Sequence, residues 1–381
     1  MAHFLKGGVA ASSLALVMAY ASSSVAQDAT LKIGGRVMLD YTFADVNDPD
    51  SSINDIEARR VRLNATGKYG SAVSYKVELN KTGDKAINVE DAWIQFSPEN
   101  SKFKIKVGQF QTQNSLDELT SSRFSSTLER AAFTDAFGFN RRLGVGVSTS
   151  GDNYTVDAGV FTDNLGGPDF DSVGNTVNLR GTYNPVKTDE TLVHLGASWR
   201  YRNGSDSDDS AVNDGIRYRQ RPYTHIAPSR IITTQRFAKS DNFIGAEAAV
   251  IHNQFWASGE YSVMKANGAA TNPDANFGGY YGEVGVFIGG KKGYKGGKFN
   301  RPIVDNPLGE GGFGAFSFVA RYDSVDLQDE IYLGKLDTVI LGADWWPTKQ
   351  TRLGINYFDA DAENGSAESA NGFVARLGFD F

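Results

Sequence analysis

Several residue types that carry chemistry are missing or rare in this 381-residue chain. It contains no cysteine, which excludes a disulfide framework, a thiolate nucleophile and a cysteine-ligated metal site. Four histidines are too few for a histidine-rich metal centre. No G-x-S-x-G motif supplies an exposed serine nucleophile. The sequence therefore predicts no metal and no cofactor. An enzyme such as a barrel lipase or protease is the disfavoured alternative.

Long apolar segments are also missing after residue 26, where no run of about 18 apolar residues occurs. No membrane-spanning helix is therefore predicted. A chain without such helices can still reside in a membrane as a closed β-barrel, because every backbone group then finds a hydrogen-bond partner. Alternating strands average to a polar mean hydropathy, so this class is invisible to a hydropathy window.

The first residues differ in composition from the rest. "MAHFLKGGVAASSLALVMAYASSSVAQDA" places Lys6 before an apolar stretch at residues 9–21, and small residues precede Gln27. This order predicts a signal peptide over residues 1–26, and the alternative of an anchor helix is disfavoured because the apolar stretch is short. The full chain has a net charge of −7, and removal of Lys6 with residues 1–26 leaves the exported chain acidic. Such a chain suits a bacterial periplasm or outer membrane, and it does not favour nucleic acid as a partner.

Strict alternation of apolar and polar residues recurs along the chain. In "KFKIKVGQF" (102–110) three lysines alternate with Phe103, Ile105 and Val107, and "LKIGGRVMLDYTF" (31–43) and "VSYKVELNK" (73–81) follow the same rule. In a strand, such residues lie on opposite faces. Stacked soluble sandwiches also alternate, but more than a dozen such segments favour a membrane barrel.

The joints between these segments form two classes. Some are tight, and others are long and polar, as a barrel with short turns on one rim and long loops on the other requires. The count predicts an all-β, antiparallel transmembrane barrel of about 16 strands over residues 27–381, with 214–222 assigned to a loop. The segment 289–311 falls where a short joint is expected and does not fit the scheme. The chain ends on "GFVARLGFDF", which carries Phe381 in the apolar register, as the closing strand of an outer-membrane protein does.

The polar face of these strands is basic. Because a lysine facing lipid at the bilayer midplane costs about 2–4 kcal/mol, the cations are expected to point into the lumen. Two further segments are predicted to fold into the bore, namely 114–133, with Ser115 as a helix N-cap, and "IRYRQRPY" (216–223). The third-loop arginines are expected to meet the wall lysines. The predicted anion-binding and pore-lining residues are Arg60, Arg62, Lys76, Lys102, Lys104, Lys106, Arg123, Arg130, Arg142, Arg217, Arg219 and Arg221. For any single wall cation, pairing with a lumen carboxylate remains the open alternative.

Several motifs together resemble the phosphate-selective porin O and P family of outer-membrane porins. They are "LKIGGRVMLDY", "ARRVRLNATGKYG", "NVEDAWIQF", the order "VGQF–SLDELTSSR–LERA–RRLGVGV" within 105–161, and "IRYRQRP". The resemblance implies a 16-stranded barrel, a homotrimer, an inward-folded third loop, and an arginine ladder (Arg217, Arg219, Arg221) that descends to a lysine-rich constriction. After "VGQF" this chain has the neutral residues 111–114 where the family has Lys-Glu-Pro-like residues, which predicts weaker anion binding at the constriction.

The combined interpretation is a porin of the bacterial outer membrane, in contact with outer-membrane lipid and lipopolysaccharide. Its predicted permeants are anions, phosphate or polyphosphate-like, because rings of Lys and Arg replace the hydration shell of such ions. A general or organic-anion diffusion porin on the same scaffold is the alternative.

Overall fold

A computed structural model describes residues 29–47, 52–82, 86–165, 174–204, 215–269 and 271–381. The predicted signal peptide lies outside these residues. Neither of the helices in the described ranges has the length and apolar character needed to cross a bilayer.

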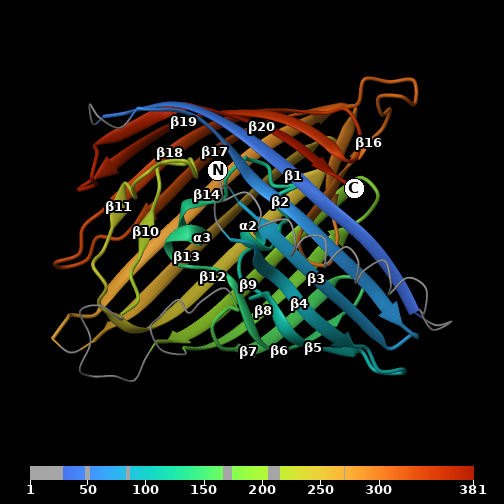
Figure 1. Ribbon diagram of the computed structural model, residues 1–381, viewed down its shortest axis with the longest axis horizontal. Coiled ribbons are helices and arrows are strands. Elements are labelled where there is room, and N and C mark those ends of the chain that lie inside the picture. The colour runs from blue at the N-terminus through green and yellow to red at the C-terminus, as the bar shows by residue number, and fades with distance from the viewer. Residues whose placement is uncertain (1–28, 48–51, 83–85, 166–173, 205–214, 270) are drawn as a thin grey trace, which may run out of the picture.

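Sixteen strands of the described chain close into one antiparallel barrel, as predicted (Figure 1). Consecutive strands pair with one another, and β20 returns to pair with β1, so the sheet has no free edge. The barrel strands are β1 (Ala29–Val46), β2 (Ile53–Tyr69), β3 (Val73–Lys81), β4 (Asn88–Phe96), β5 (Phe103–Gln111), β6 (Arg141–Ser150), β7 (Tyr154–Phe161), β8 (Asn175–Lys187), β9 (Thr191–Asn203), β12 (Ala238–His252), β13 (Phe255–Gly268), β14 (Ala275–Ile288), β17 (Ala315–Asp326), β18 (Lys335–Trp346), β19 (Thr351–Glu363) and β20 (Ser369–Asp380).

Opposite exposure of neighbouring residues confirms the predicted alternation. On β20 the outward side chains of Phe373 and Leu377 are each 47% exposed, whereas Val374 and Arg376 between them are buried. The same holds on β3, where Val77 is exposed and Glu78 is buried. A continuous apolar outer surface with polar groups on the inner side is what a bilayer requires of a barrel.

The two rims differ as expected. Tight turns such as 70–72, 151–153 and 253–254 join strands on the rim where the chain ends, and this rim is therefore assigned to the periplasm. The opposite rim carries the long third loop (112–140) and the fifth loop, which the structure describes at 204 and over 215–237.

The third loop folds into the barrel, where α2 (Leu116–Leu119) and α3 (Ala132–Ala136) lie within the ring of strands (Figure 1). The predicted cap is confirmed, since Ser115 Oγ accepts from the Glu118 N–H, although the helix has only one turn. The Glu260 carboxylate on β13 accepts from the N–H groups of Leu116 and Asp117 at 3.0 and 2.7 Å, which ties the helix start to the wall.

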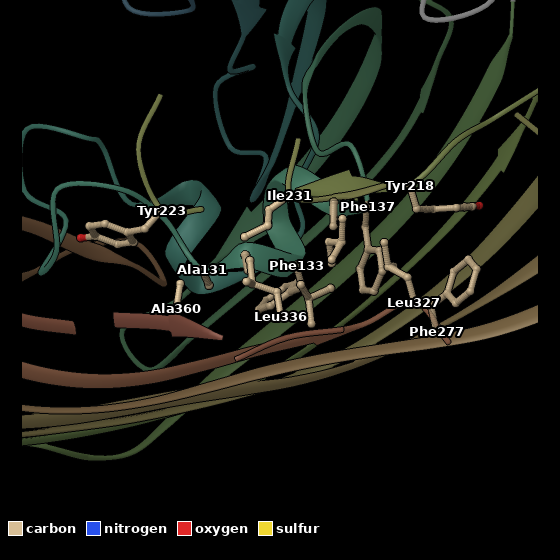
Figure 2. Packing of buried hydrophobic residues seen from close by; sticks show 14 of the residues in the cluster. Ala131, Phe133, Phe137, Tyr218, Tyr223, Ile231, Phe277, Leu327, Leu336 and Ala360 are labelled. Carbon is tan, nitrogen blue, oxygen red and sulfur yellow. The ribbon is translucent and has the colours of Figure 1, made fainter. Parts of the chain in front are cut away.

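The described part of the fifth loop also lies inside the barrel. It contains a short ribbon, β10 (Arg219–Gln220) and β11 (Ile232–Thr233), so the prediction that 214–222 is a loop rather than a barrel strand is correct over its described residues. Together the two loops form an apolar cluster against the wall, in which Phe133 of α3 and Phe137, the residue that follows it, pack with Ile231 and with Leu336 of β18 (Figure 2).

This packing changes the inner face of one half of the barrel. On β18 the outward Val339 and Leu341 are exposed, but the inward Leu336 and Ile340 are apolar as well and at most 1% exposed. The expectation of a polar inner face on every strand is therefore wrong for the extracellular half of β12–β20. Here the third and fifth loops, and not water, cover the wall.

The segment 289–311, which did not fit the short-turn scheme, contains a hairpin of β15 (Gly290–Tyr294) and β16 (Phe299–Val304). It starts from the periplasmic rim and reaches the third loop, because Lys292 Nζ donates to Ser126 Oγ at 2.5 Å. Lys292 is buried between the rings of Trp256 and Phe299, at 4.8 and 4.6 Å from their centroids.

Candidate functional site

Two cavities of the interior lie beside strands of β2–β8. A cavity of about 500 Å³, here called the central cavity, is bounded by β2, β4, the third loop and the fifth loop. A second cavity of about 240 Å³, here called the lower cavity, lies between β5–β8 and the tip of the β15–β16 hairpin. The charged residues that line the central cavity are Arg59, Arg60, Arg62, Glu90, Glu118, Glu129, Arg130, Asp135, Arg141, Arg221, His225 and Arg230.

Most cations of the central cavity are paired with a carboxylate. The Arg59 guanidinium binds Glu129 through two hydrogen bonds of 2.9 and 2.8 Å, in bidentate geometry. Arg130 lies 3.3 Å from the Glu118 carboxylate, and it also donates to two backbone carbonyls of the third loop. Arg230 pairs with Asp135 of α3. The cavity therefore presents ion pairs, not a row of bare guanidinium groups.

The wall arginines follow the same rule. Arg62 donates to Glu78 at 3.0 Å and lies 2.7 Å from Glu90, and Arg141 lies 2.8 Å from the same Glu90. Burial raises the pKa of Glu118 in the third loop, and the neighbouring Arg130 opposes this change. Within the described chain, Arg60 is the one lining arginine for which no carboxylate lies within 4 Å.

Three arginines of the fifth loop share one side of their segment. Arg217, Arg219 and Arg221 are half-buried, whereas Tyr218 and Gln220 between them are buried. Burial and the neighbouring Arg217 and Arg230 lower the pKa of Arg219 to about 10. Crowded like charges of this kind favour a nearby anion.

The lower cavity is built around two lysines. Lys106 of β5 lies over the Trp93 ring at 4.5 Å, and Lys298 enters from the β15–β16 hairpin. Ser148, Thr155 and other hydroxyl groups line the space between them, and Asp157 is the single acid among its lining residues. Burial, together with the charges of Arg180 and Lys106, lowers the pKa of Lys298 to about 8.

The structure brings several of the sequence-predicted residues to these cavities. Arg60, Arg62, Arg130 and Arg221 line the central cavity, and Lys106 lines the lower one. Lys104, two residues before Lys106 on β5, is exposed. Lys76 points inward but is held by Glu78 and Asp91 at 3.1 and 2.5 Å.

Other predicted residues occupy different places. Lys102 precedes β5 and lies exposed in the turn, because the strand begins only at Phe103. Arg142 is 1% exposed beside Asp163, so we place it within the wall. The expectation that third-loop arginines meet wall lysines is wrong, since Arg123 pairs with Asp380 at 3.2 Å and Arg130 with Glu118.

Sequence reasoning missed two kinds of lining residue. The carboxylates Glu90, Glu118 and Glu129 sit among the arginines, and Lys298 arrives from a segment that had no place in the strand count. The glycine-flanked "GYKGGKF" around Lys298 was the available signal, since it reads as a turn between two short strands.

The chain is similar to known porins along its length. The sequence pattern of the family "Phosphate-selective porin O and P" matches residues 31–381. An uncharacterized protein of Caulobacter vibrioides is 34% identical, over 87% of this chain and 68% of its own length. Porin O of Pseudomonas aeruginosa is 25% identical, over 92% and 88%. Among solved structures, the anion-selective porin from Comamonas acidovorans superposes with a TM-score of 0.61 at 14% identity, over 93% of this chain and 100% of that one.

Proposed function

Since the chain belongs to the phosphate-selective porin O and P family, whose fold indicates the outer membrane, we propose that it forms an anion-selective channel through this membrane. The channel follows the polar side of the interior, from the fifth-loop arginines through the central cavity to the lower cavity.

One observation carries this proposal. Several cations along that route have no carboxylate within 4 Å among the described residues, whereas the lining acids of the central cavity are all paired with a cation. The unpaired cations come from two strands of the wall, β2 and β5, and from two insertions into the lumen. They are Arg217, Arg219, Arg60, Lys104, Lys106 and Lys298.

The spacing of these groups suits conduction. An anion that leaves bulk water needs donors that replace its hydration shell, and the planar forks of arginine and the ammonium groups of lysine supply them. Several modest sites in succession let an ion step along, whereas one deep site would trap it. The exposed Lys104 and the lower-cavity lysines then form the periplasmic exit.

Phosphate is the permeant that the family resemblance implies, and the arginine ladder of the fifth loop supports it. Small organic anions are the second candidate, and a specific observation favours them: the central cavity contains Glu90, Glu118 and Glu129.

We further propose a homotrimer assembled after removal of residues 1–26, with the exposed apolar belt in contact with outer-membrane lipid and lipopolysaccharide.

Reversal potentials across planar bilayers test the channel. Under a salt gradient, the purified protein is expected to favour anions at neutral pH, and a preference for cations would contradict the proposal. The double variant Arg219→Glu with Lys104→Glu is expected to invert the selectivity. Lys265→Glu with Lys335→Glu is the matched control, because it makes the same charge change on side chains at the extracellular rim, and it should leave the permeability ratio nearly unchanged.

A further inference from the structure

We propose that Asp157 of β7 makes the lower cavity selective for tetrahedral oxyanions that carry a hydroxyl group, such as hydrogen phosphate, over dianions without one, such as sulfate. This inference rests on the proposed anion channel, and it names the feature of the anion that the lower cavity recognises. Hydrogen phosphate and sulfate are both tetrahedral dianions, so shape and charge do not separate them. Discrimination then depends on a protein group that accepts a hydrogen bond from the anion.

The two lysines of the lower cavity supply the attraction for an anion. Lys106 of β5 and Lys298 of the β15–β16 hairpin both line the cavity, and neither ammonium group has a carboxylate within 4 Å in the part of the chain that the structure describes. The Gly297 carbonyl oxygen accepts from Arg180 at 2.7 Å, which holds the tip of the hairpin against the wall. Because an ammonium group has donors and no acceptor, these lysines bind the oxygen atoms of phosphate and of sulfate alike.

Asp157 differs from the acids of the central cavity because it has no cation of its own. It is half-buried, and over the described residues its carboxylate has no hydrogen-bond or ion-pair partner. Arg180 lies opposite Asp157 on the β7–β8 ladder, but its guanidinium is committed to Glu247 of β12 through two hydrogen bonds. The lone pairs of Asp157 therefore remain free to accept from a ligand.

A second unsatisfied acceptor lines the same cavity. Asn178 of β8 is 1% exposed, and its amide nitrogen donates to the Gln113 carbonyl oxygen at 3.0 Å. Its Oδ1 atom has no hydrogen-bond partner among the described residues. Buried polar atoms are normally hydrogen-bonded, so the acceptors of Asp157 and Asn178 both call for a donor. An anion with a hydroxyl group brings such a donor into a cavity that otherwise attracts it through lysines.

These contacts treat phosphate and sulfate differently. A phosphate held by the lysines donates its hydroxyl group to Asp157 in a charge-assisted hydrogen bond. Sulfate presents acceptor oxygen atoms alone, so the same carboxylate repels it and stays unpaired. A site built to hydrogen-bond a ligand hydroxyl group rejects the analogue that lacks it. Because water reaches this cavity and satisfies part of the unpaired acceptor, we expect a discrimination of about tenfold, far below that of a dry site.

The central cavity is not expected to make this distinction. Its seven arginines exceed its four carboxylates, and each of these carboxylates is already paired with an arginine. An excess of paired and unpaired guanidinium groups attracts phosphate and sulfate on the basis of charge. The choice between the two anions is therefore assigned to the lower cavity.

Block of the chloride current by added anions tests this inference on single channels of the full protein at neutral pH. Phosphate and arsenate keep at least one hydroxyl group there. Sulfate has none, and in monofluorophosphate a fluorine atom replaces it. Phosphate and arsenate are expected to halve the current at concentrations about tenfold below those of sulfate and monofluorophosphate. Equal block by phosphate and monofluorophosphate would overturn the inference without any variant.

The variant Asp157→Asn assigns the effect to the carboxylate. It removes the repulsion of sulfate and weakens the acceptor for the phosphate hydroxyl group, so block by sulfate is expected to strengthen about tenfold, with less than a threefold change for phosphate. Lys106→Gln is expected to weaken block by both anions to the same extent. Asp152→Asn is the matched control, because it makes the same change on an exposed side chain of the β6–β7 turn that lines neither cavity, and it should keep the wild-type ratio.

The outcomes separate this inference from the channel itself. If sulfate and phosphate block equally while reversal potentials still favour anions, the role of Asp157 is wrong and the channel stands. A cation-selective current overturns both. If Asp157→Asn fails to assemble, Asp157→Ser makes the same charge change with a smaller side chain. A wild-type ratio of phosphate to sulfate block in either variant overturns the inference.

Discussion

The two halves of the barrel interior are made from the same kind of strand but serve different purposes. Along β2–β8 some of the inward side chains, such as those of Arg60 and Lys106, line the two cavities. Along β12–β20 they are covered by the third and fifth loops, and they form an apolar cluster with a set of buried ion pairs below it. The position of the third and fifth loops thus determines which part of the wall lines the cavities and which part packs against the loops.

The largest effect is expected from the buried ion pairs of the packed half. Arg321 is 3% exposed and binds Asp117 of the third loop at 3.2 Å and Glu283 of β14 at 2.8 Å. Arg321→Met leaves both carboxylates buried without this partner, so we expect a loss of about 3–5 kcal/mol in the free energy of unfolding. Denaturant unfolding in detergent, followed by circular dichroism, measures it.

Lys335→Met is the control for this variant, because the ion pair of Lys335 with Asp337 lies at the exposed rim and is worth at most about 1 kcal/mol. Equal stability losses in the two variants would mean that the packed half does not depend on its buried charges. The Arg321→Met channel is also expected to show a larger and noisier conductance, because Asp117 anchors the third loop.

A smaller loss is expected from the apolar cluster. Leu336 on β18 is 1% exposed and packs within the cluster formed by α3 and the fifth loop (Figure 2). Leu336→Ala removes part of that packing and is expected to cost about 2–3 kcal/mol. Because no charge changes on the water-filled side, the ratio of anion to cation permeability should stay the same. A shifted ratio would show that the two halves are not separate.

The water-filled side is expected to respond to pH. Lys298 carries its charge below its pKa of about 8 and loses it as the pH rises through that value, well before an ordinary lysine near 10.4. Anion preference is therefore expected to fall between about pH 7 and 9, and Lys298→Gln should remove this step. The measurement is the reversal potential across that range.

Lys292 provides a matched control for this experiment. Burial lowers the pKa of Lys292 to about 8 as well. Its ammonium group, however, lies between Trp256 and Phe299, and it lines neither cavity. Lys292→Met is expected to keep the pH step. Loss of the step in this variant but not in Lys298→Gln would reverse the assignment.

The smallest effect is expected at Lys102. It lies exposed in the turn before β5, so Lys102→Gln should change stability by less than about 0.5 kcal/mol and leave selectivity unaltered. Lys106→Gln, two strand positions beyond Lys104, removes a cavity lysine and its contact with Trp93, and it should reduce anion preference. Similar reversal potentials for these two variants would contradict the placement of the lower cavity.

Much of the fold follows from period-two alternation, because lipid demands one apolar face from every strand. This is why Val77, Leu377 and Phe379 are correctly placed on the outer surface. Lipid places no such requirement on the side chains of the inner face. Leu336 and Ile340 are apolar because loops distant in sequence cover them, and strand periodicity contains no information about that cover.

The sequence predicts the positive charge of the candidate site, but it does not predict which carboxylates pair with its arginines. The spacing predicted that arginines of β2 and of the fifth loop lie on a common face, since alternate positions do so, and Arg60, Arg62 and Arg221 line the central cavity. Their partners were not, because Glu129 reaches Arg59 from 70 residues away, and only the folded third loop brings the two together. The turn of the hairpin that supplies Lys298 has a local signal in "GYKGGKF", but the sequence does not show that this hairpin lies against β5–β8 inside the barrel.

The meeting of the third loop with the β15–β16 hairpin has a consequence for assembly. Lys292 and Ser126 are separated by 166 residues in the chain, and contacts between segments so far apart form late, because the entropy of closing a long chain must be met first. A newly inserted barrel is thus expected to pass through a wide, poorly discriminating stage before these two insertions join. Ion selectivity would then be the last property that the maturing porin acquires.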